Sequence, residues 1–190
     1  KENFVFTVDS KLIGFINPAA SFVCSKKSIF AHGPQESKDI TSLSSASVIK
    51  ALKRIKVLFP IKEHNMAEVE SFFKNNSLSR SYSYLLNNCT SYNQFKRLLA
   101  KISHTKILIL GCGGIGSNVS YLLAGLGFNT FVLVDGDKIE ESNLNRQALC
   151  KIEDVGKFKV IVLKRELFHR LKNLHIEIIS TFATPILLKK

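Results

Sequence analysis

The chain has 190 residues, of which 45% are hydrophobic, and a formal net charge of +12. It contains no apolar run of the roughly 18 residues that span a membrane and no secretory signal, so we expect a cytoplasmic protein without a membrane partner. Four scattered cysteines without a C-x-x-C pair argue against a disulfide framework, and we assign no metal ligand within these residues.

Residues 1–75 are predicted to form a small winged-helix-like α+β domain. Short strands followed by short helices, with a polar stretch at 33–45 between them, fit such a module. The predicted elements are strands at 3–7, 12–16 and 21–24, a helix at 46–58 that Pro60 ends, and a helix at 66–74.

Three roles are open for this domain: a clamp that recognises a substrate or leader peptide, a packing or dimerisation element, and a DNA-binding module. The predicted helix lacks a concentrated base-reading face, and the 21 lysines and 6 arginines are spread through both halves of the chain, which argues against nucleic acid. An exposed strand of the wing can instead accept a peptide as an added strand, which is the interpretation we favour.

Residues 76–104 are predicted to connect this domain to an ATP-binding domain at 105–190. The stretch 75–91 is rich in Ser, Asn and Tyr, as in a linker or extended crossover, and a helix is expected at 91–102.

A glycine turn follows the apolar run Ile107–Leu110, which is short enough for a buried parallel strand. Gly111, Gly113 and Gly116 have the G-x-G-x-x-G spacing of a nucleotide-binding turn, and Gly114 lies within it. The first glycine permits a tight bend, the second lets the backbone approach a phosphate, and the third lets the next helix pack closely. N–H groups at the start of that helix then face the anion.

The residues after the turn complete a βαβ unit. A helix is expected at 118–126, ended by Gly127, and the β-branched run 130–134 predicts a second strand. Asp135 ends this strand about 20 residues beyond the turn, where a carboxylate can accept hydrogen bonds from ribose hydroxyls.

Further polar residues indicate which nucleotide binds. A G-x-x-K sequence ends at Lys159, and hydride transfer to a nicotinamide needs neither this lysine nor Arg146. A guanidinium grips a phosphate in two places and an ammonium acts as a point charge, so both residues are predicted to clamp a triphosphate. Asp137 has two interpretations, direct function and a turn cap or surface ion pair. Val160, Leu163, Leu167 and Leu171 form the apolar face of the following helix, with Lys164, Arg165 and Arg170 on its outer side.

Four segments resemble motifs of the ubiquitin-activating-enzyme-like adenylating family typified by ThiF and MoeB, and most closely the MccB type of peptide adenylase. They are GCGGIG at 111–116, LVDGD at 133–137, NLNRQ at 143–147 and VGKFK at 155–159. The resemblance, clear over about residues 106–179, implies a Rossmann-like parallel sheet and catalysis with ATP and Mg²⁺. A substrate carboxylate would attack the α-phosphorus to give an acyl adenylate and pyrophosphate.

Carried over residue by residue, the resemblance places the glycine turn against the phosphates and Asp135 on the ribose. It implies that Asn143, Arg146 and Lys159 contact the phosphates, and it gives Gln147 no separate role.

The segment LSRSY at 78–82 resembles the R-Y-x-R segment from which the family sends an arginine into the neighbouring subunit's ATP site. The resemblance implies a homodimer in which Arg80 makes this contact; Ser77 and Leu78 depart from the motif. The other interpretation of Arg80 is a solvated linker charge.

The family continues with a magnesium-binding aspartate, a carboxylate pocket and often two C-x-x-C pairs, so zinc is expected only through residues beyond this chain. We therefore expect a fragment of a longer enzyme, or a truncated, inactive form.

Together these features favour adenylation of a carboxyl group on a short ribosomal precursor peptide, in the biosynthesis of a peptide antibiotic. The alternatives are activation of a sulfur-carrier or ubiquitin-like protein, an NAD-dependent oxidoreductase, and a non-catalytic peptide-binding scaffold.

Overall fold

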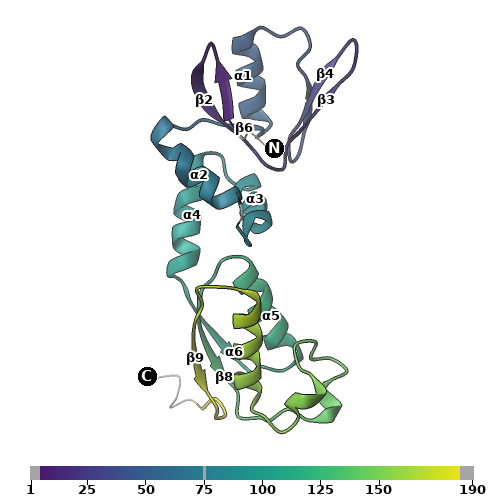
Figure 1. Ribbon diagram of the computed structural model, residues 1–190, viewed down its shortest axis with the longest axis vertical. Coiled ribbons are helices and arrows are strands. Elements are labelled where there is room, and N and C mark those ends of the chain that lie inside the picture. The colour runs from purple at the N-terminus through teal and green to yellow at the C-terminus, as the bar shows by residue number, and fades with distance from the viewer. Residues whose placement is uncertain (1–4, 75, 185–190) are drawn as a thin grey trace. The chain divides into compact units, whose positions relative to one another are not determined.

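The computed structural model describes residues 5–74 and 76–184 (Figure 1). The chain separates into two compact units, Lys1–Leu98 and Leu99–Lys190, and the boundary falls within helix α4 (Tyr92–His104). The first unit mixes helices with antiparallel strands, whereas the second is an α/β unit with a parallel sheet. Within the described ranges, no helix combines the length and the apolar character needed to cross a membrane.

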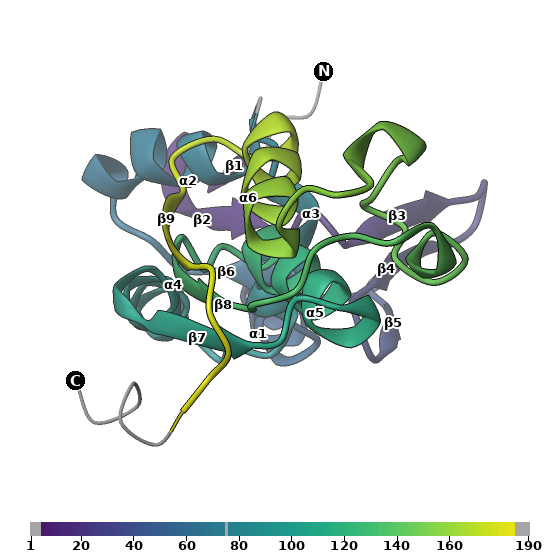
Figure 2. The ribbon, with the colours of Figure 1, turned by 90° about the horizontal axis from the view of Figure 1, so that it is seen from below.

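Two antiparallel three-stranded sheets organise the start of the first unit. One has the order β1 (Val5–Val8), β2 (Lys11–Ile16), β6 (Leu58–Phe59), and the other has the order β3 (Ser21–Cys24), β4 (Ile29–His32), β5 (Ser37–Asp39). The β3–β4 hairpin extends to one side of helix α1 (Figure 2). The predicted strands 12–16 and 21–24 match β2 and β3; of the prediction at 3–7, residues 3 and 4 lie outside the described part. Strand β5 lies in the polar stretch at 33–45, for which no strand was predicted.

The helix predicted at 46–58 was too long at its C-terminal end. Helix α1 is Ser45–Arg54, and its N-cap Ser44 accepts a hydrogen bond from the Ser47 N–H. Lys56 then takes a positive φ of 56°, which a helix cannot continue through. The next apolar residues form β6, where Leu58 pairs with Ile16 of β2. Burial beside β2 therefore overrides the helical spacing of these side chains.

The linker expected at 75–91 was wrong over most of its length, because it contains helix α3 (Ser79–Asn87). Leu86 of α3 is fully buried, and Tyr82 packs edge-to-face on Phe72 of α2 (Met66–Phe73). Buried Asn17 donates to the Asn87 side chain over 2.9 Å, which ties the end of α3 to the loop after β2. These are long-range contacts that a composition rich in Ser, Asn and Tyr does not reveal.

The second unit is a parallel sheet of order β7-β8-β9 with its helices against one face. The elements are β7 (Lys106–Leu110), α5 (Gly114–Gly125), β8 (Thr130–Val134), α6 (Lys159–Arg170) and β9 (His175–Ile179). Phe131 and Leu133 of β8 are fully buried against a core that includes Val160, Leu163 and Leu167 of α6. The βαβ prediction is confirmed, although α5 begins at Gly114 rather than at 118, because the helix starts within the glycine turn itself.

We expect Leu167→Ala to lower the free energy of unfolding by about 2–5 kcal/mol, because Leu167 has no exposed surface and its loss leaves a cavity in the core of the second unit. The neighbouring Phe168, 43% exposed on the same helix, is the matched control. Phe168→Ala should change the free energy by less than about 1 kcal/mol. Urea denaturation followed by circular dichroism measures both, and equal effects would contradict this description of the core.

Candidate functional site

The carboxyl ends of the three parallel strands bring the glycine turn and Asp135 together. The Gly111 N–H donates to the Val134 carbonyl over 2.8 Å, and the Asp135 N–H donates to the Ile179 carbonyl over 3.1 Å. The ladder between β7, β8 and β9 thus continues one step beyond the strands. Loops at this edge of a parallel sheet are where ligands bind in open α/β folds.

The glycines of the turn are required by its geometry. Gly111 has a φ of +88°, a conformation that other residues rarely adopt. A Cβ added to Gly116 would lie 1.8 Å from the Gly111 carbonyl oxygen, so only glycine allows this close approach of α5 to the turn. Gly113 is the N-cap of α5 and has no side chain to accept from the first helical N–H groups. These N–H groups form the kind of site that binds phosphate.

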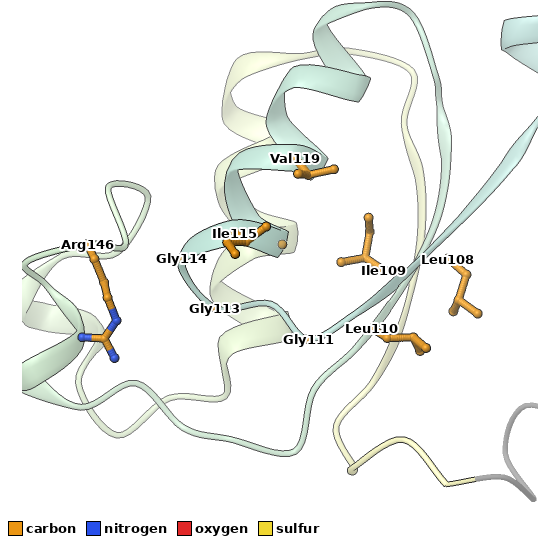
Figure 3. A pocket seen from close by; sticks show the side chains of 10 residues that line it. Leu108, Ile109, Leu110, Gly111, Gly113, Gly114, Ile115, Val119 and Arg146 are labelled. Carbon is orange, nitrogen blue, oxygen red and sulfur yellow. The ribbon is translucent and has the colours of Figure 1, made fainter.

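A pocket of about 820 Å³ lies over the turn (Figure 3). Its walls are the glycine turn, Ile115 and Val119 of α5, the end of β7 and Arg146. The side chain of Arg146 passes beside the turn, because a Cβ added to Gly114 would lie 3.7 Å from Arg146 Cγ. Its Nη1 donates to the Ser142 carbonyl over 2.7 Å and to Asn145 Oδ1 over 3.1 Å. The structure thus places the predicted turn and the predicted arginine on one pocket.

Asp135 fastens the turn to the loop after β8. Its Oδ2 accepts from the Cys112 N–H over 2.7 Å and its Oδ1 accepts from the Asp137 N–H over 2.8 Å. The residue is only 9% exposed. Each carboxylate oxygen has a further lone pair, so these bonds leave acceptor capacity for ribose hydroxyls.

Asp137 and Lys159 form an ion pair, the second of the two interpretations predicted for Asp137. Lys159 Nζ lies 2.8 Å from Asp137 Oδ2, and the Lys159 N–H donates to the Asp137 carbonyl over 3.0 Å. The lysine side chain is 12% exposed and the aspartate side chain 51%. A mostly buried ammonium is therefore held at the site by a carboxylate that water can reach.

Asn143 and Gln147 are both buried, with exposures of 5% and 1%. Asn143 Oδ1 accepts from the Glu140 N–H over 3.3 Å and so caps its own 3-10 turn, η2 (Glu141–Asn143). Gln147 lies near the turn, because a Cβ added to Gly113 would be 4.0 Å from its Nε2. The packing of Gln147 against the turn is a role that the sequence motif did not assign.

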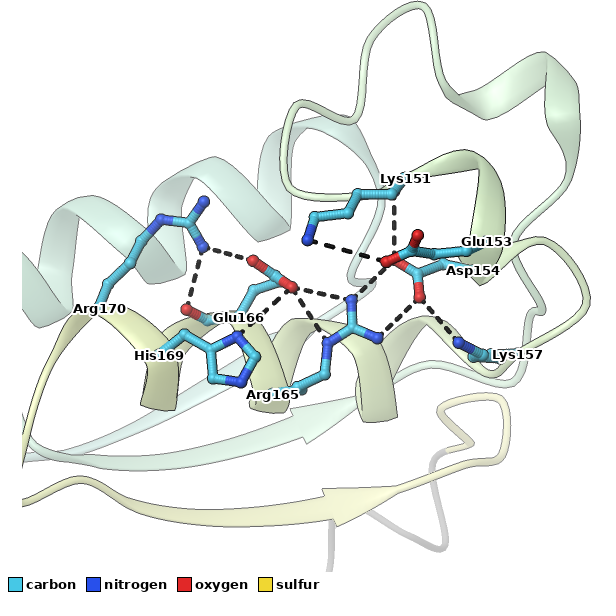
Figure 4. A network of polar contacts seen from close by, with 8 residues as sticks. All are labelled: Lys151, Glu153, Asp154, Lys157, Arg165, Glu166, His169 and Arg170. Atoms are coloured by element: carbon cyan, nitrogen blue, oxygen red, sulfur yellow. Dashed lines mark hydrogen bonds and ion pairs between the residues drawn. The ribbon is translucent and has the colours of Figure 1, made fainter.

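A network of charges on α6 was missed by sequence reasoning, which placed Arg165 and Arg170 on the outer side of the helix (Figure 4). Arg165 binds the fully buried carboxylate of Asp154 through two hydrogen bonds of 2.7 and 2.8 Å. Arg170 binds Glu166, whose side chain is 4% exposed, over 2.6 Å. Hydrogen bonds from Arg165 hold the pKa of Asp154 well below its usual range. The i,i+4 spacing of Glu166 and Arg170 is a signal that sequence reasoning could have used.

Cys112 lies in the glycine turn of the second unit, and Arg80 lies in the first unit. Burial raises the pKa of the Cys112 thiol to about 12, so this cysteine is a packing residue of the turn rather than a nucleophile at neutral pH. Arg80 belongs to α3 of the first unit, where it lines a pocket of about 400 Å³ with Tyr84 and Asn87.

Over residues 5–74 and 76–184, no three His, Cys, Asp or Glu side chains gather as metal ligands would.

Comparison with known proteins gives a match between residues 85–188 and the model of the ThiF family. The adenylyltransferase and sulfurtransferase uba4 of Neosartorya fischeri is 50% identical over 60 residues, which are 32% of this chain and 12% of uba4. The NEDD8-activating enzyme E1 catalytic subunit of Arabidopsis thaliana is 40% identical over 80 residues, 42% of this chain and 17% of that protein.

Among solved structures, E. coli MccB in complex with AMPCPP and MccA matches with a TM-score of 0.58 and 25% identity. The match covers 87% of this chain and 55% of the MccB chain. It therefore includes both units of this protein, whereas this chain spans little more than half of MccB.

We expect Asp135→Asn to lower the free energy of unfolding by about 1–3 kcal/mol. An asparagine offers one acceptor oxygen, so either the Cys112 N–H or the Asp137 N–H is left without an acceptor in a buried place. Glu177→Gln is the control, because that carboxylate is 61% exposed and lies 3.5 Å from Lys106. If urea denaturation gave both variants the same stability, Asp135 would not fasten the turn.

Proposed function

The chain belongs to the ThiF family, and from this we propose that the full protein catalyses ATP-dependent adenylation of a carboxyl group. The observation that carries the proposal is the glycine turn fastened by Asp135, with Arg146 on its pocket and Lys159 held beside the same loop. The family match favours adenylation over the oxidoreductase alternative. It also favours an adenylyltransferase over a scaffold without catalysis.

The reaction needs positioned charge rather than a protein nucleophile. A carboxylate oxygen of the substrate attacks the α-phosphorus of ATP, the bond from that phosphorus to the bridging oxygen breaks, and pyrophosphate leaves with the electron pair. The N–H groups at the start of α5, together with Arg146 and Lys159, stabilise the charge on the phosphate oxygens. Asp135 holds the ribose through its remaining lone pairs, while Asn143 and Gln147 shape the loop beside the turn.

Magnesium would accompany ATP at this site. This ion binds through substrate phosphates and as few as one or two protein carboxylates, and it neutralises charge on the leaving pyrophosphate. Asp137 fits this need, because its side chain is half-exposed beside Lys159.

For the substrate, we favour a ribosomal precursor peptide in the biosynthesis of a peptide antibiotic. The support is the match of both units to MccB in complex with MccA. The second candidate is the C-terminus of a sulfur-carrier or ubiquitin-like protein, which the similarity to uba4 and to the NEDD8-activating subunit supports. Those similarities lie in 60 and 80 residues, whereas the MccB match extends over the first unit as well.

The β3 edge of the first unit is our proposed place for the peptide. Among the described residues β3 pairs with β4 alone, and all four of its residues are exposed. Hydrogen-bonded and non-hydrogen-bonded pairs alternate along an antiparallel hairpin. The Ser25 N–H donates to the Ser28 carbonyl, and the Ile29 carbonyl accepts from Ile40 on the opposite side of β4. The pair Cys24–Ile29 is thus a non-hydrogen-bonded one, and the Cys24 backbone faces the open edge.

The side chains near the β3 edge are suited to binding a peptide strand that is apolar and has acidic residues at one end. Phe22 and Val23 are 42% and 54% exposed, and Lys26 and Lys27 lie in the turn of the hairpin. A peptide added at the edge would gain backbone hydrogen bonds from β3, contacts with these apolar side chains and attraction to the lysines.

Arg80 is also part of the proposal. In a homodimer, Arg80 of one subunit would contribute to the ATP site of the other.

We expect Lys159→Ala to reduce ATP–pyrophosphate exchange about 100-fold, because it removes an ammonium from the developing charge on the phosphates. Lys164→Ala is the matched control, since Lys164 is a lysine of the same helix that lies over the ring of Phe168. It should leave exchange within about twofold of the unchanged protein. The assay is run with the full-length protein, candidate peptides and carrier proteins ending in Gly-Gly.

The outcomes separate the candidate functions. If the Lys159→Ala variant kept its exchange activity, Lys159 would not act in the ATP site. Exchange with a Gly-Gly carrier and with none of the peptides would overturn the choice of a peptide substrate.

A second prediction tests the β3 edge. Cys24→Pro removes an outward N–H donor and should weaken peptide binding about tenfold, whereas Cys24→Ala keeps the donor and should bind within about twofold of the original. Proline is tolerated at an edge position whose N–H faces solvent, so the fold should persist in both variants. Isothermal titration calorimetry measures the difference, with the peptide that supports ATP–pyrophosphate exchange as the ligand. Equal affinities would place the peptide elsewhere.

A further inference from the structure

The segment that carries Lys159 into the site is fixed from two sides. Residues 155–158 connect the 3-10 turn η3 (Ile152–Asp154) to α6. On one side, the Ile139 N–H donates to the Lys157 carbonyl over 2.8 Å, and the Gly156 N–H donates to the Ile139 carbonyl over 2.8 Å. At its beginning, the segment follows Asp154, whose side chain makes a second set of contacts.

Asp154 holds the beginning of this segment by a buried ion pair. Arg165 donates from both terminal nitrogens to the two oxygens of the carboxylate, which has no exposed surface. Lys157 Nζ is 3.1 Å from Oδ1, and the Lys151 N–H donates to Oδ2 over 3.2 Å (Figure 4). A two-point pair fixes orientation as well as distance. Burying the carboxylate is tolerated only while these partners stay in place.

The pair acts on α6, the helix that begins with Lys159. Arg165 comes six residues later, about 9 Å along the helix axis. The N-cap Phe158 has no side-chain cap hydrogen bond, so its side chain does not hold the start of the helix. The Asp154–Arg165 pair instead joins the helix to the turn that precedes the segment. A shift of residues 155–158 would therefore strain the pair.

The pair and Lys159 also share a neighbourhood. Burial raises the pKa of the Cys150 thiol, the charges of Asp154 and Glu166 raise it further, and those of Lys159 and Arg165 lower it. Cys150 Sγ lies 3.5 Å from Oε1 of Gln147, the buried residue near Gly113. The thiol thus lies within electrostatic reach of both the lysine and the pair.

We propose that Asp154 and Arg165 are a positioning pair for Lys159, which fixes α6 against residues 155–158 and so aims the ammonium at the ATP phosphates. The inference rests on the proposed role of Lys159 in ATP binding. Without the pair, Lys159 keeps its charge but is spread over more orientations, and its contact with the phosphates weakens.

The test is a double-mutant cycle in the full-length protein, with binding of ATP in MgCl₂ measured by isothermal titration calorimetry. Arg165→Gln should weaken ATP binding about tenfold, which is the range of coupling seen between neighbouring residues. Arg170→Gln is the matched control, because it makes the same charge change on the same helix. Both arginines bind Glu166, so each variant removes a partner of Glu166, but only Arg165→Gln also breaks the pair with Asp154. Arg170→Gln should therefore change affinity less than about twofold. In a Lys159→Ala background, Arg165→Gln should cause no further loss.

Three outcomes would overturn the inference. Equal losses from Arg165→Gln and Arg170→Gln would indicate a general effect on α6, and a full further loss in the Lys159→Ala background would show that Arg165 acts by another route. Absence of ATP binding to the unaltered protein would refute the proposed function itself, and the inference with it. Circular dichroism checks folding. If Arg165→Gln does not fold, Arg165→Lys, which keeps the charge but not the fork, is judged by the same criteria and should give a smaller loss.

Discussion

The carboxylate of Asp135 joins two backbone segments that follow neighbouring strands, by accepting from the N–H groups of Cys112 and Asp137. For the first of these bonds the chain must turn sharply at Gly111 and bring Gly116 against the Gly111 carbonyl oxygen. A nearly buried carboxylate is costly unless such donors satisfy it, so this arrangement is strongly favoured once the strands have paired. The open end of α5 and the loop that contains Asp137 thereby acquire fixed positions around one side chain.

From that loop the constraint passes to α6 through pairs of opposite charge. Asp137 holds Lys159 at the start of the helix, Asp154 holds Arg165 in its middle, and Glu166 holds Arg170 at its end. Each of these three cations therefore has a carboxylate partner. The net positive charge of the chain does not arise from them. Buried pairs of this kind are weak evidence for stability, because desolvation offsets attraction, but they specify one geometry over others.

Sequence predicted the second unit better than the first, for a physical reason. The β7–α5–β8 unit depends on local periodicity and on glycines whose backbone requirements are visible in the sequence. Strand β6, by contrast, exists because Leu58 and Phe59 pair with β2 about 40 residues away. Helix α3 exists because Leu86 is buried and Tyr82 packs on Phe72 of another helix. The motif identified Asp137 and Lys159 individually, but their 2.8 Å ion pair follows from the backbone pairing on either side of Lys138 and Phe158. Arg165 was misplaced because its partner lies across the bend at Gly156.

The two cations proposed to contact the phosphates, Arg146 and Lys159, differ in the contacts that each would lose when ATP binds. Arg146 is exposed and donates to neutral oxygens of Ser142 and Asn145. Lys159 is nearly buried and must exchange Asp137 for a phosphate. That exchange is inexpensive for the carboxylate, because Asp137 is 51% exposed and water can take the place of the ammonium. In the proposed ATP site, an incoming triphosphate would therefore find the Arg146 guanidinium available for its first contact. Lys159 would stay paired with Asp137 until the larger charge of the phosphates displaces that carboxylate.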